Sequence, residues 1–202
     1  MVSVPRLWPG ETVAILGGGP SLTREDVEYC RGKVRTIAIN QAYQLASWAD
    51  VLYACDRAFW RRNPEAVQFA GLKYSLTAKP KDVPTVQVLK YRTDHGLDLD
   101  PRYLATGHNS GYQAINLALH LGATRILLLG YDMQRGPRGE QNWHRQNPKS
   151  NSPYVKFRKA FPSIVGPLHR AGVSVINCSR VSALTCFPCR PLREVLCVEV
   201  AA

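Results

Sequence analysis

The sequence predicts an α/β protein with a mostly parallel central sheet, and two observations predict it. Short, mostly apolar runs with β-branched residues recur along the chain, as is typical of strands buried on both faces of a parallel sheet. Segments with helical patterns separate these runs at the spacing of strand–helix–strand units. The composition agrees, because 45% hydrophobic and 20% charged residues in a chain of 202 exclude a disordered chain, a collagen and a coiled coil.

The first half of the chain opens with a strand, a glycine turn and a helix. Residues 12–16 read Thr-Val-Ala-Ile-Leu, which indicates a buried strand, and the turn Gly17-Gly-Gly-Pro-Ser21 follows at once. A helix is expected from Leu22, because acidic residues in its first turns are favoured by the helix dipole. Two further strands are predicted at residues 34–39 and 51–55.

The middle of the chain is less regular, and order returns after it. Residues 73–104 contain three prolines, which predicts loops and one short strand within 85–89. Residues 110–121 predict an apolar helix, and Gly122 is a residue type common after a helix C-terminus. Residues 125–130 predict the most apolar strand of the chain.

A polar loop, a helix and a last strand complete the expected domain. Residues 133–153 form a long polar connection, and connections of that length in a compact domain are often functional lids. Residues 154–171 predict a helix with two prolines, and residues 173–176 predict the last strand. Residues 191–198 are compatible with a helix or a strand. We expect one domain over residues 1–202, with an irregular segment at 73–104 and a lid at 133–153.

Polar residues and glycines gather where the predicted strands end. Ligands of open parallel sheets bind beyond the carboxyl ends of the strands, so these residues are expected on one rim. Glycines let a backbone approach a ligand closely, and amides at the start of a helix attract phosphate. The expected nucleotide-binding residues are Gly17, Gly18, Gly19, Ser21, Asn40, Gln41, Asn109, Ser110 and Gly111.

These positions also have structural alternatives. The glycine turn could be only a tight turn, with Ser21 capping the helix that follows. Asn40 could cap the next helix instead of holding a ribose or a base edge, and Asn109 or Ser110 could be the N-cap of a helix. The turn is neither a G-x-G-x-x-G fingerprint nor a P-loop, because no Gly-Lys-Ser/Thr follows it.

Asp132 and His144 are the expected catalytic residues. Asp132 follows a predicted strand, where a carboxylate could hold Mg²⁺ or a sugar hydroxyl, or form a cap or salt bridge. His144 lies in the polar loop; an imidazole titrates near neutrality, so this residue could be a general base or an ordinary exposed side chain. Arg135, Arg138 and Arg145 in the same loop are expected to bind phosphate. The other histidines are expected to be core or surface residues.

The chain is strongly basic. Its 26 lysines and arginines against 15 acidic residues give a net charge of +11, which attracts nucleotides, phosphosugars, nucleic acid or anionic surfaces. The alternative is a solvated basic surface, because the charge is dispersed. No apolar run is long enough to span a bilayer and no signal segment opens the chain, so we expect a cytoplasmic protein without a membrane span.

Six cysteines include Cys186 and Cys189 in a C-x-x-C arrangement. Reduced thiols are the default in a cytoplasmic protein. A structural zinc site usually needs four ligands and only one such pair is present, so zinc and redox chemistry stay open beside incidental thiols. The sequence holds no G-x-S-x-G or H-E-x-x-H motif and no paired carboxylates at a diagnostic spacing, which disfavours serine and zinc hydrolases.

Five features in order resemble one known superfamily. They are Ile15-Leu-Gly-Gly-Gly-Pro-Ser-Leu22, Ala38-Ile-Asn-Gln41, Asn109-Ser-Gly111, Leu128-Leu-Gly-Tyr-Asp132 and a loop histidine. Over residues 13–187 their order and spacing are similar to the CMP-sialic-acid-dependent sialyltransferases (glycosyltransferase family 42). They are also similar to the 6-hydroxymethyl-dihydropterin pyrophosphokinase-like (DUF115) proteins. Short phage and prophage proteins look similar too, which implies the cytoplasm of a host cell if a phage encodes the chain.

The resemblance implies a Rossmann-like, three-layer nucleotide-binding fold. In the sialyltransferases the positions that match Gly17, Gly19, Ser21, Asn40, Ser110 and Gly111 hold the CMP moiety. The family's loop histidine, matched by His144, deprotonates the acceptor hydroxyl. Two departures stand out: Gly18 replaces an asparagine of the family, and the family's phosphate-binding tyrosines have no counterpart in residues 133–142, where the loop arginines could substitute.

Three functions follow as expectations. The first is a glycosyltransferase that moves a sugar from a nucleotide-sugar donor to a hydroxyl acceptor, which could be anionic and include nucleic acid. The second is a pyrophosphokinase that uses ATP and Mg²⁺, with Asp132 helping to hold the metal. The third is a non-catalytic nucleotide or nucleic-acid binder. Assembly into a homo-oligomer is compatible with each of them.

Overall fold

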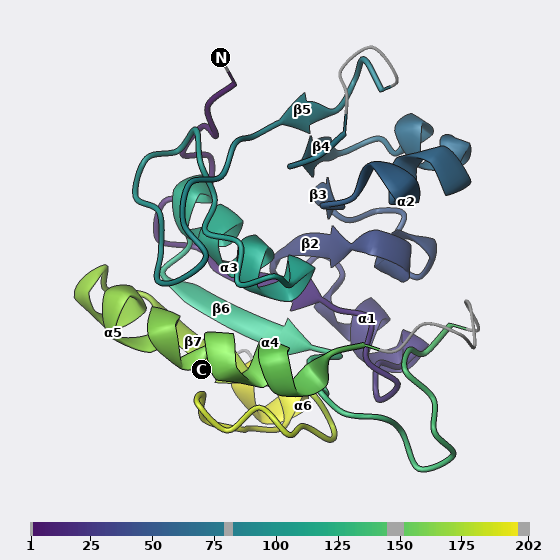
Figure 1. Cartoon of the computed structure of the whole chain (residues 1–202). Coiled ribbons are helices and arrows are strands. Elements are labelled where there is room, and N and C mark those ends of the chain that lie inside the picture. Colours follow the sequence, from purple (N-terminus) through teal and green to yellow (C-terminus); the bar gives the residue numbers. More distant parts are fainter. Residues whose placement is uncertain (1, 79–82, 145–151, 198–202) are drawn as a thin grey trace, which may run out of the picture.

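The computed structural model describes residues 2–78, 83–144 and 152–197. Its strands form one sheet in the order β5-β4-β3-β2-β1-β6-β7, and every neighbouring pair is parallel (Figure 1). The α/β fold with a parallel sheet is therefore confirmed. The strands are β1 (Thr12–Leu16), β2 (Arg35–Ile39), β3 (Val51–Tyr53), β4 (Leu72–Ser75), β5 (Gln87–Val88), β6 (Arg125–Leu129) and β7 (Ser174–Asn177).

Helices cover both faces of the sheet and give three layers (Figure 1). Val13 and Ile15 of β1 face one side, where they share a core with α3 and α5. Ala14 and Leu16 face the other side, with α1, α2 and α6. No helix in the described ranges has the length and hydropathy needed to cross a membrane. The helices are α1 (Arg24–Cys30), η1 (Asn40–Gln44), α2 (Arg57–Arg62), η2 (Pro64–Gln68), α3 (Ser110–Leu121), α4 (Tyr154–Ala160), α5 (Pro162–Arg170) and α6 (Leu192–Val195).

The strand order reverses at β1. The chain adds β2 to β5 on one side of β1, and then returns through α3 to place β6 and β7 on the other side. A reversal of this kind opens a crevice at the carboxyl ends of the two strands that flank it, here β1 and β6. The loops that follow β1 and β6 therefore lie next to each other.

Several elements differ from the sequence-based expectation. Residues 154–171 form two helices rather than one, because Pro162 lacks an N–H group and occupies the first turn of α5. Strand β5, at one edge of the sheet, lies within the strand expected at 85–89, whereas β4 and α2 have no predicted counterpart. Helix α1 is capped by Thr23, whose hydroxyl accepts a hydrogen bond from the Asp26 N–H (3.2 Å), rather than by Ser21.

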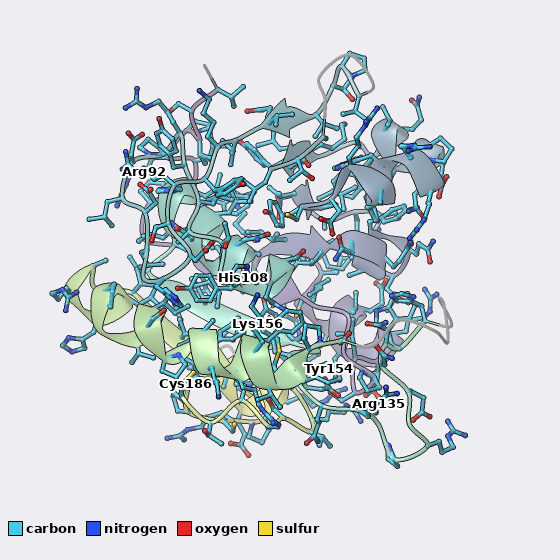
Figure 2. The ribbon with its side chains drawn as sticks, viewed as in Figure 1. Arg92, His108, Arg135, Tyr154, Lys156 and Cys186 are labelled. Carbon is cyan, nitrogen blue, oxygen red and sulfur yellow. The ribbon has the colours of Figure 1, made fainter. Side chains whose placement is uncertain are left out.

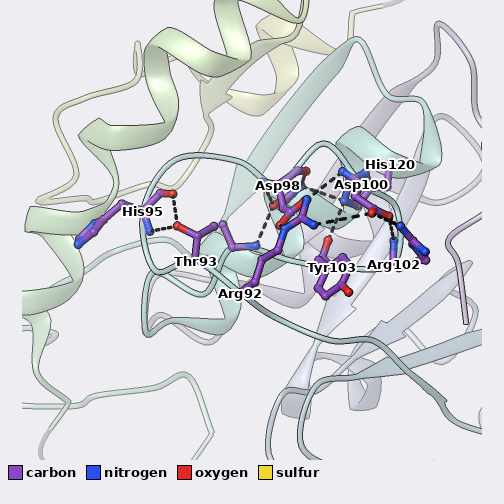
Figure 3. A network of polar contacts seen from close by, with 10 residues as sticks. Arg92, Thr93, His95, Asp98, Asp100, Arg102, Tyr103 and His120 are labelled. Carbon is purple, nitrogen blue, oxygen red and sulfur yellow. Dashed lines mark hydrogen bonds and ion pairs between the residues drawn. The ribbon is translucent and has the colours of Figure 1, made fainter. Parts of the chain in front are cut away.

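Buried polar bonds order the chain between β5 and α3 (Figure 3). The buried carboxylate of Asp98 accepts hydrogen bonds from Nε and Nη2 of Arg92, at 2.7 and 2.8 Å. Asn116 of α3 accepts hydrogen bonds from two backbone N–H groups of this segment. His120, also on α3, lies 2.9 Å from the carbonyl oxygen of Tyr103. Side chains of α3 thus fix a segment that has little regular structure.

Candidate functional site

A cavity of about 450 Å³ opens at the carboxyl ends of β1 and β6. It lies where the strand order reverses, which is where open α/β sheets bind ligands, and its volume suits a small molecule. Except for Ser21 and Gln41, the residues predicted to bind a nucleotide line this cavity. They are Gly17, Gly18, Gly19, Asn40, Asn109, Ser110 and Gly111.

The glycine turn packs directly on the end of β6. The N–H of Gly19 donates to the carbonyl oxygen of Gly130, at 2.8 Å. A Cβ atom at Gly17 would lie 2.6 Å from the same oxygen, and a Cβ atom at Gly19 would overlap a carboxylate oxygen of Asp132. Packing against the Gly130 carbonyl oxygen and, at position 19, the Asp132 carboxylate therefore requires glycine at positions 17 and 19.

The carboxylate of Asp132 accepts two hydrogen bonds from the glycine turn, outside the cavity lining. One of its oxygens accepts the N–H of Ser21 and the other accepts the Ser21 hydroxyl, both at 2.8 Å. Asp132 is 3% exposed. Burial raises the pKa of its carboxyl, against the opposing effect of the hydrogen bonds from Ser21. Neither Ser21 nor Asp132 is among the residues that line the cavity. Their observed contacts with each other shape the glycine turn. The catalytic role of Asp132 stays a prediction.

Three non-glycine residues of the described chain have left-handed backbones, and all three line the cavity. Asn40 (φ 49°) follows β2, His108 (φ 52°) precedes α3 and Met133 (φ 51°) follows β6. This conformation costs free energy for a residue with a side chain, and asparagine tolerates it best. Strained backbone clusters at functional sites, which is a second, independent reason to assign a function to this cavity.

The N-terminus of α3 lies beside the cavity. Asn109 is the N-cap, because its side-chain oxygen accepts the N–H groups of Gly111 (2.8 Å) and Tyr112 (3.2 Å). Ser110 is the first helical residue and lines the cavity with Asn109. The positive end of the helix dipole therefore favours an anionic group there.

The described part of the loop after β6 closes one side of the cavity. The N–H of Trp143 donates to the carbonyl oxygen of Gly18 at 3.1 Å, and the Asn142 side chain lies over Gly18. The same loop also contacts α4, because the Tyr154 hydroxyl donates to the carbonyl oxygen of Gln141, at 2.9 Å. The loop is thus tied both to the glycine turn and to α4.

His144, the expected general base, is not among the residues that line the cavity. Its ring is partly buried and meets the Trp143 ring edge-on, with the centroids 5.0 Å apart. Burial lowers the pKa of this imidazole. Its Nδ1 atom has no hydrogen-bond partner within the described residues. Its catalytic role stays a prediction.

The loop arginines also lie off the cavity lining. Arg135 donates to the carbonyl oxygen of Gly139 (2.9 Å), and Arg138 donates to the carboxylate of Glu140 (2.8 Å). Arg135 and Tyr154 are labelled in Figure 2, on the loop and on α4. Arg145 lies outside the described residues. Phosphate binding by these arginines stays a prediction.

The sequence-based prediction missed several lining residues and included two, Ser21 and Gln41, that lie elsewhere. Gln41 is buried, and its amide donates to the side-chain oxygen of Asn63 (2.8 Å). Asp56, His108 and Tyr154 line the cavity but were not among the predicted site residues. Asp56 directly follows a predicted strand, so the strand-end rule places it on this rim, and His108 immediately precedes Asn109 at the start of a predicted helix. No comparable signal marks Tyr154.

The C-x-x-C pair has no metal site around it in the part of the chain that the structure describes. There, no group of three or more His, Cys, Asp or Glu residues is placed to hold a metal ion. Cys186 is partly buried and Cys189 is exposed.

Two cysteines outside this pair, Cys30 and Cys178, are buried. Burial raises the pKa of both thiols to about 12, which disfavours the reactive thiolate.

Comparison with known proteins supports the fold. No protein-family model matches the chain, and no curated protein matches it. A solved structure of the sialyltransferase CstII from Campylobacter jejuni, in complex with the substrate analogue cytidine-5'-monophosphate, is similar with a TM-score of 0.55. The match covers 91% of this chain and 86% of that one, at 12% sequence identity. The chain therefore has an α/β fold similar to that of a glycosyltransferase.

Proposed function

We propose that the chain is a glycosyltransferase whose cavity between the ends of β1 and β6 binds the nucleotide of a nucleotide-sugar donor. One observation supports this most strongly. The cavity, the glycine turn and the start of α3 meet where the strand order reverses, in a fold similar to that of a sialyltransferase solved with cytidine-5'-monophosphate.

Each part of the cavity has a role in donor binding. Gly18 lets the ligand approach the backbone, and the Asn40 amide hydrogen-bonds a ribose hydroxyl or a base edge. The Ser110 hydroxyl and the dipole of α3 stabilise the phosphate, including the charge that grows on it as the nucleotide leaves. No lysine or arginine is among the described residues that line the cavity, so the stabilisation that this described lining offers consists of hydrogen bonds and the dipole.

Calorimetric titration with nucleotides tests the proposal. The panel is CMP, UDP, GDP, AMP and ATP, each with and without Mg²⁺. We expect one nucleoside mono- or diphosphate to bind without metal, and its sugar conjugate to be a donor. Binding of ATP only with Mg²⁺ would favour a pyrophosphokinase instead, and binding of no nucleotide would contradict both enzymes.

A matched pair of serine variants localises the binding. Ser110→Ala removes a hydroxyl at the start of α3, and the loss of one hydrogen bond should weaken nucleotide binding roughly 2–10-fold. Ser174→Ala, at an exposed position on β7, should leave the affinity unchanged. Equal effects of the two variants on affinity would show that the nucleotide binds outside this cavity.

A further inference from the structure

A second cavity, of about 410 Å³, adjoins the first. Four residues line both cavities: Asp56, His108, Asn109 and Ser110. A ligand in one cavity and a ligand in the other would therefore meet beside these residues. Two adjoining cavities are what a transfer between two bound molecules requires.

The lining of the second cavity favours an uncharged, hydroxyl-rich ligand. Tyr91 is 57% exposed there and offers a ring for the apolar face of a sugar. The exposed carboxylate of Asp94, which lines the second cavity and not the first, accepts hydrogen bonds from hydroxyl groups and repels anions. No lysine or arginine is among the described residues that line this cavity. A phosphorylated acceptor or a nucleic acid is thus disfavoured, although the chain is basic overall.

His108 lies next to Asp94 at the junction of the two cavities. Its Nε2 atom lies 3.5 Å from Oδ2 of Asp94, and the Thr106 hydroxyl donates to the other oxygen of that carboxylate. The hydrogen bond from Thr106 holds the pKa of Asp94 below its ordinary value. Figure 2 labels His108, which precedes α3, and Lys156 on α4. Asp94 therefore stays a carboxylate that orients the imidazole.

We propose that the second cavity binds an uncharged sugar as the acceptor, and that His108, oriented by Asp94, takes the proton of the attacking hydroxyl. This inference rests on the proposed function. When the proton of the neutral ring is on Nε2, which faces Asp94, Nδ1 is the ring atom that can accept a proton. The acceptor O–H bond breaks as its oxygen bonds to the anomeric carbon of the donor. The bond from that carbon to the phosphate oxygen breaks, and the nucleotide leaves with the electron pair.

Position distinguishes His108 from the other histidine considered for this role. His108 lines both cavities and has a carboxylate partner, whereas His144 lines neither cavity. A general base must come within hydrogen-bond reach of the proton that it removes. The left-handed backbone of His108 supplies a further reason, because a strained residue persists where its placement matters.

Sugar binding is tested on the full chain by NMR with glucose and glucose 6-phosphate, which differ by one phosphate group. We expect glucose to shift the resonances of Tyr91, Asp94 and His108, and glucose 6-phosphate to shift them less. Tyr91→Ala and Asp94→Asn should each weaken glucose binding at least several-fold, while His169→Gln, on the exposed side of α5, should not. Stronger binding of glucose 6-phosphate, or no shift at these residues up to the solubility limit, would overturn the proposal.

The catalytic part is tested with the donor that the nucleotide panel identifies. His108→Gly suits the left-handed backbone and leaves room for a free imidazole. Transfer should fall by about 100-fold or more, the range typical of a general base, and added imidazole should restore part of it. His108→Asn also suits this backbone, but its side chain fills the space that free imidazole would need. Transfer by this variant should therefore be slow, and added imidazole should not restore it. Full activity of His108→Gly, or loss of activity in His144→Gln alone, would contradict the assignment.

The two proposals fail in different ways. If no nucleotide binds, the proposed function and the role of His108 in transfer are wrong, while the glucose spectra still report on the second cavity. If a nucleotide binds and glucose does not, the donor site stands and only the acceptor cavity is wrong.

Discussion

Ser21 and Asp132 are joined by two hydrogen bonds although 111 residues separate them. The N–H and the hydroxyl of Ser21 engage opposite oxygens of the Asp132 carboxylate, so the turn after β1 is locked to the loop after β6. These two loops flank the reversal of the strand order, where the candidate site lies. The pair therefore fixes the shape of the site from outside it.

The buried carboxylate of Asp132 predicts a pH-dependent stability. Its pKa is raised in the folded state, mainly by burial, so the folded chain holds this proton more tightly than the unfolded chain. Stability should then fall as the pH rises from the ordinary value of 3.8 through the raised pKa, and level off above it. Denaturant unfolding of the parent chain and of Asp132→Asn across this window measures the effect. The difference between their free energies of unfolding should shift in favour of Asp132→Asn as the pH rises, and parallel curves would contradict this.

Two neighbouring alanine substitutions in the glycine turn are expected to affect different properties, one the stability of the fold and the other nucleotide binding. Gly17→Ala would place a Cβ atom 2.6 Å from the Gly130 carbonyl oxygen, and overpacking of this kind costs about 1–3 kcal/mol. Gly18→Ala would meet only the tip of the Asn142 side chain, at 3.1 Å, so stability should change by roughly 0.5 kcal/mol or less. Gly18→Ala should instead weaken nucleotide binding, because Gly18 lines the cavity. Thermal unfolding and calorimetry on both variants separate the two effects, and equal destabilisation would refute the packing argument.

The strands of the central sheet could be predicted because burial on both faces leaves an unbroken apolar run, as in β1 and β6. Strand β4 could not, because its residues Leu72–Ser75 include Lys73, whose ammonium group donates to the Phe69 carbonyl oxygen at 2.6 Å. That strand is set by tertiary contacts and not by a local pattern.

The candidate site was predictable in the same partial way. Strand ends and a helix start identified the glycine turn, Asn40 and Asn109, which do line the cavity. The direction of a loop side chain depends on tertiary packing, so the sequence could not distinguish His108 from His144. Likewise, Ser21 and Asp132 share a rim in the sequence reading, but only the fold shows that they bind each other.

Asn116 predicts how the irregular segment before α3 is held. Its side-chain oxygen accepts the N–H groups of Asp98 (2.9 Å) and Ala105 (3.0 Å), and the side chain is fully buried. Asn116→Leu would leave both N–H groups without this acceptor, at a cost of about 1–3 kcal/mol for each buried group. We expect a large loss in the free energy of unfolding and faster amide exchange over residues 92–106. Lys90→Ala, an exposed control, should change neither, and slow exchange in Asn116→Leu would show that other contacts order the segment.

Asn40 predicts a separation of stability from binding. Its left-handed backbone (φ 49°) suits glycine, whereas a left-handed residue with an ordinary side chain costs about 1–2 kcal/mol. Asn40→Gly should therefore keep the melting temperature close to that of the parent, and Asn40→Ala should lower it. Both variants lose the amide that faces the cavity, so both should bind the nucleotide more weakly, by a similar factor.

The comparison of these two variants decides whether the asparagine at position 40 serves the left-handed backbone alone or also contacts the ligand. If the asparagine serves only the backbone, glycine replaces it fully and the affinity of Asn40→Gly equals that of the parent chain. If it serves the ligand, the affinity falls in Asn40→Gly although the fold is intact. We expect the second result, because Asn40 shares the left-handed conformation with His108 and Met133, and these three residues come from separate segments and all line the cavity.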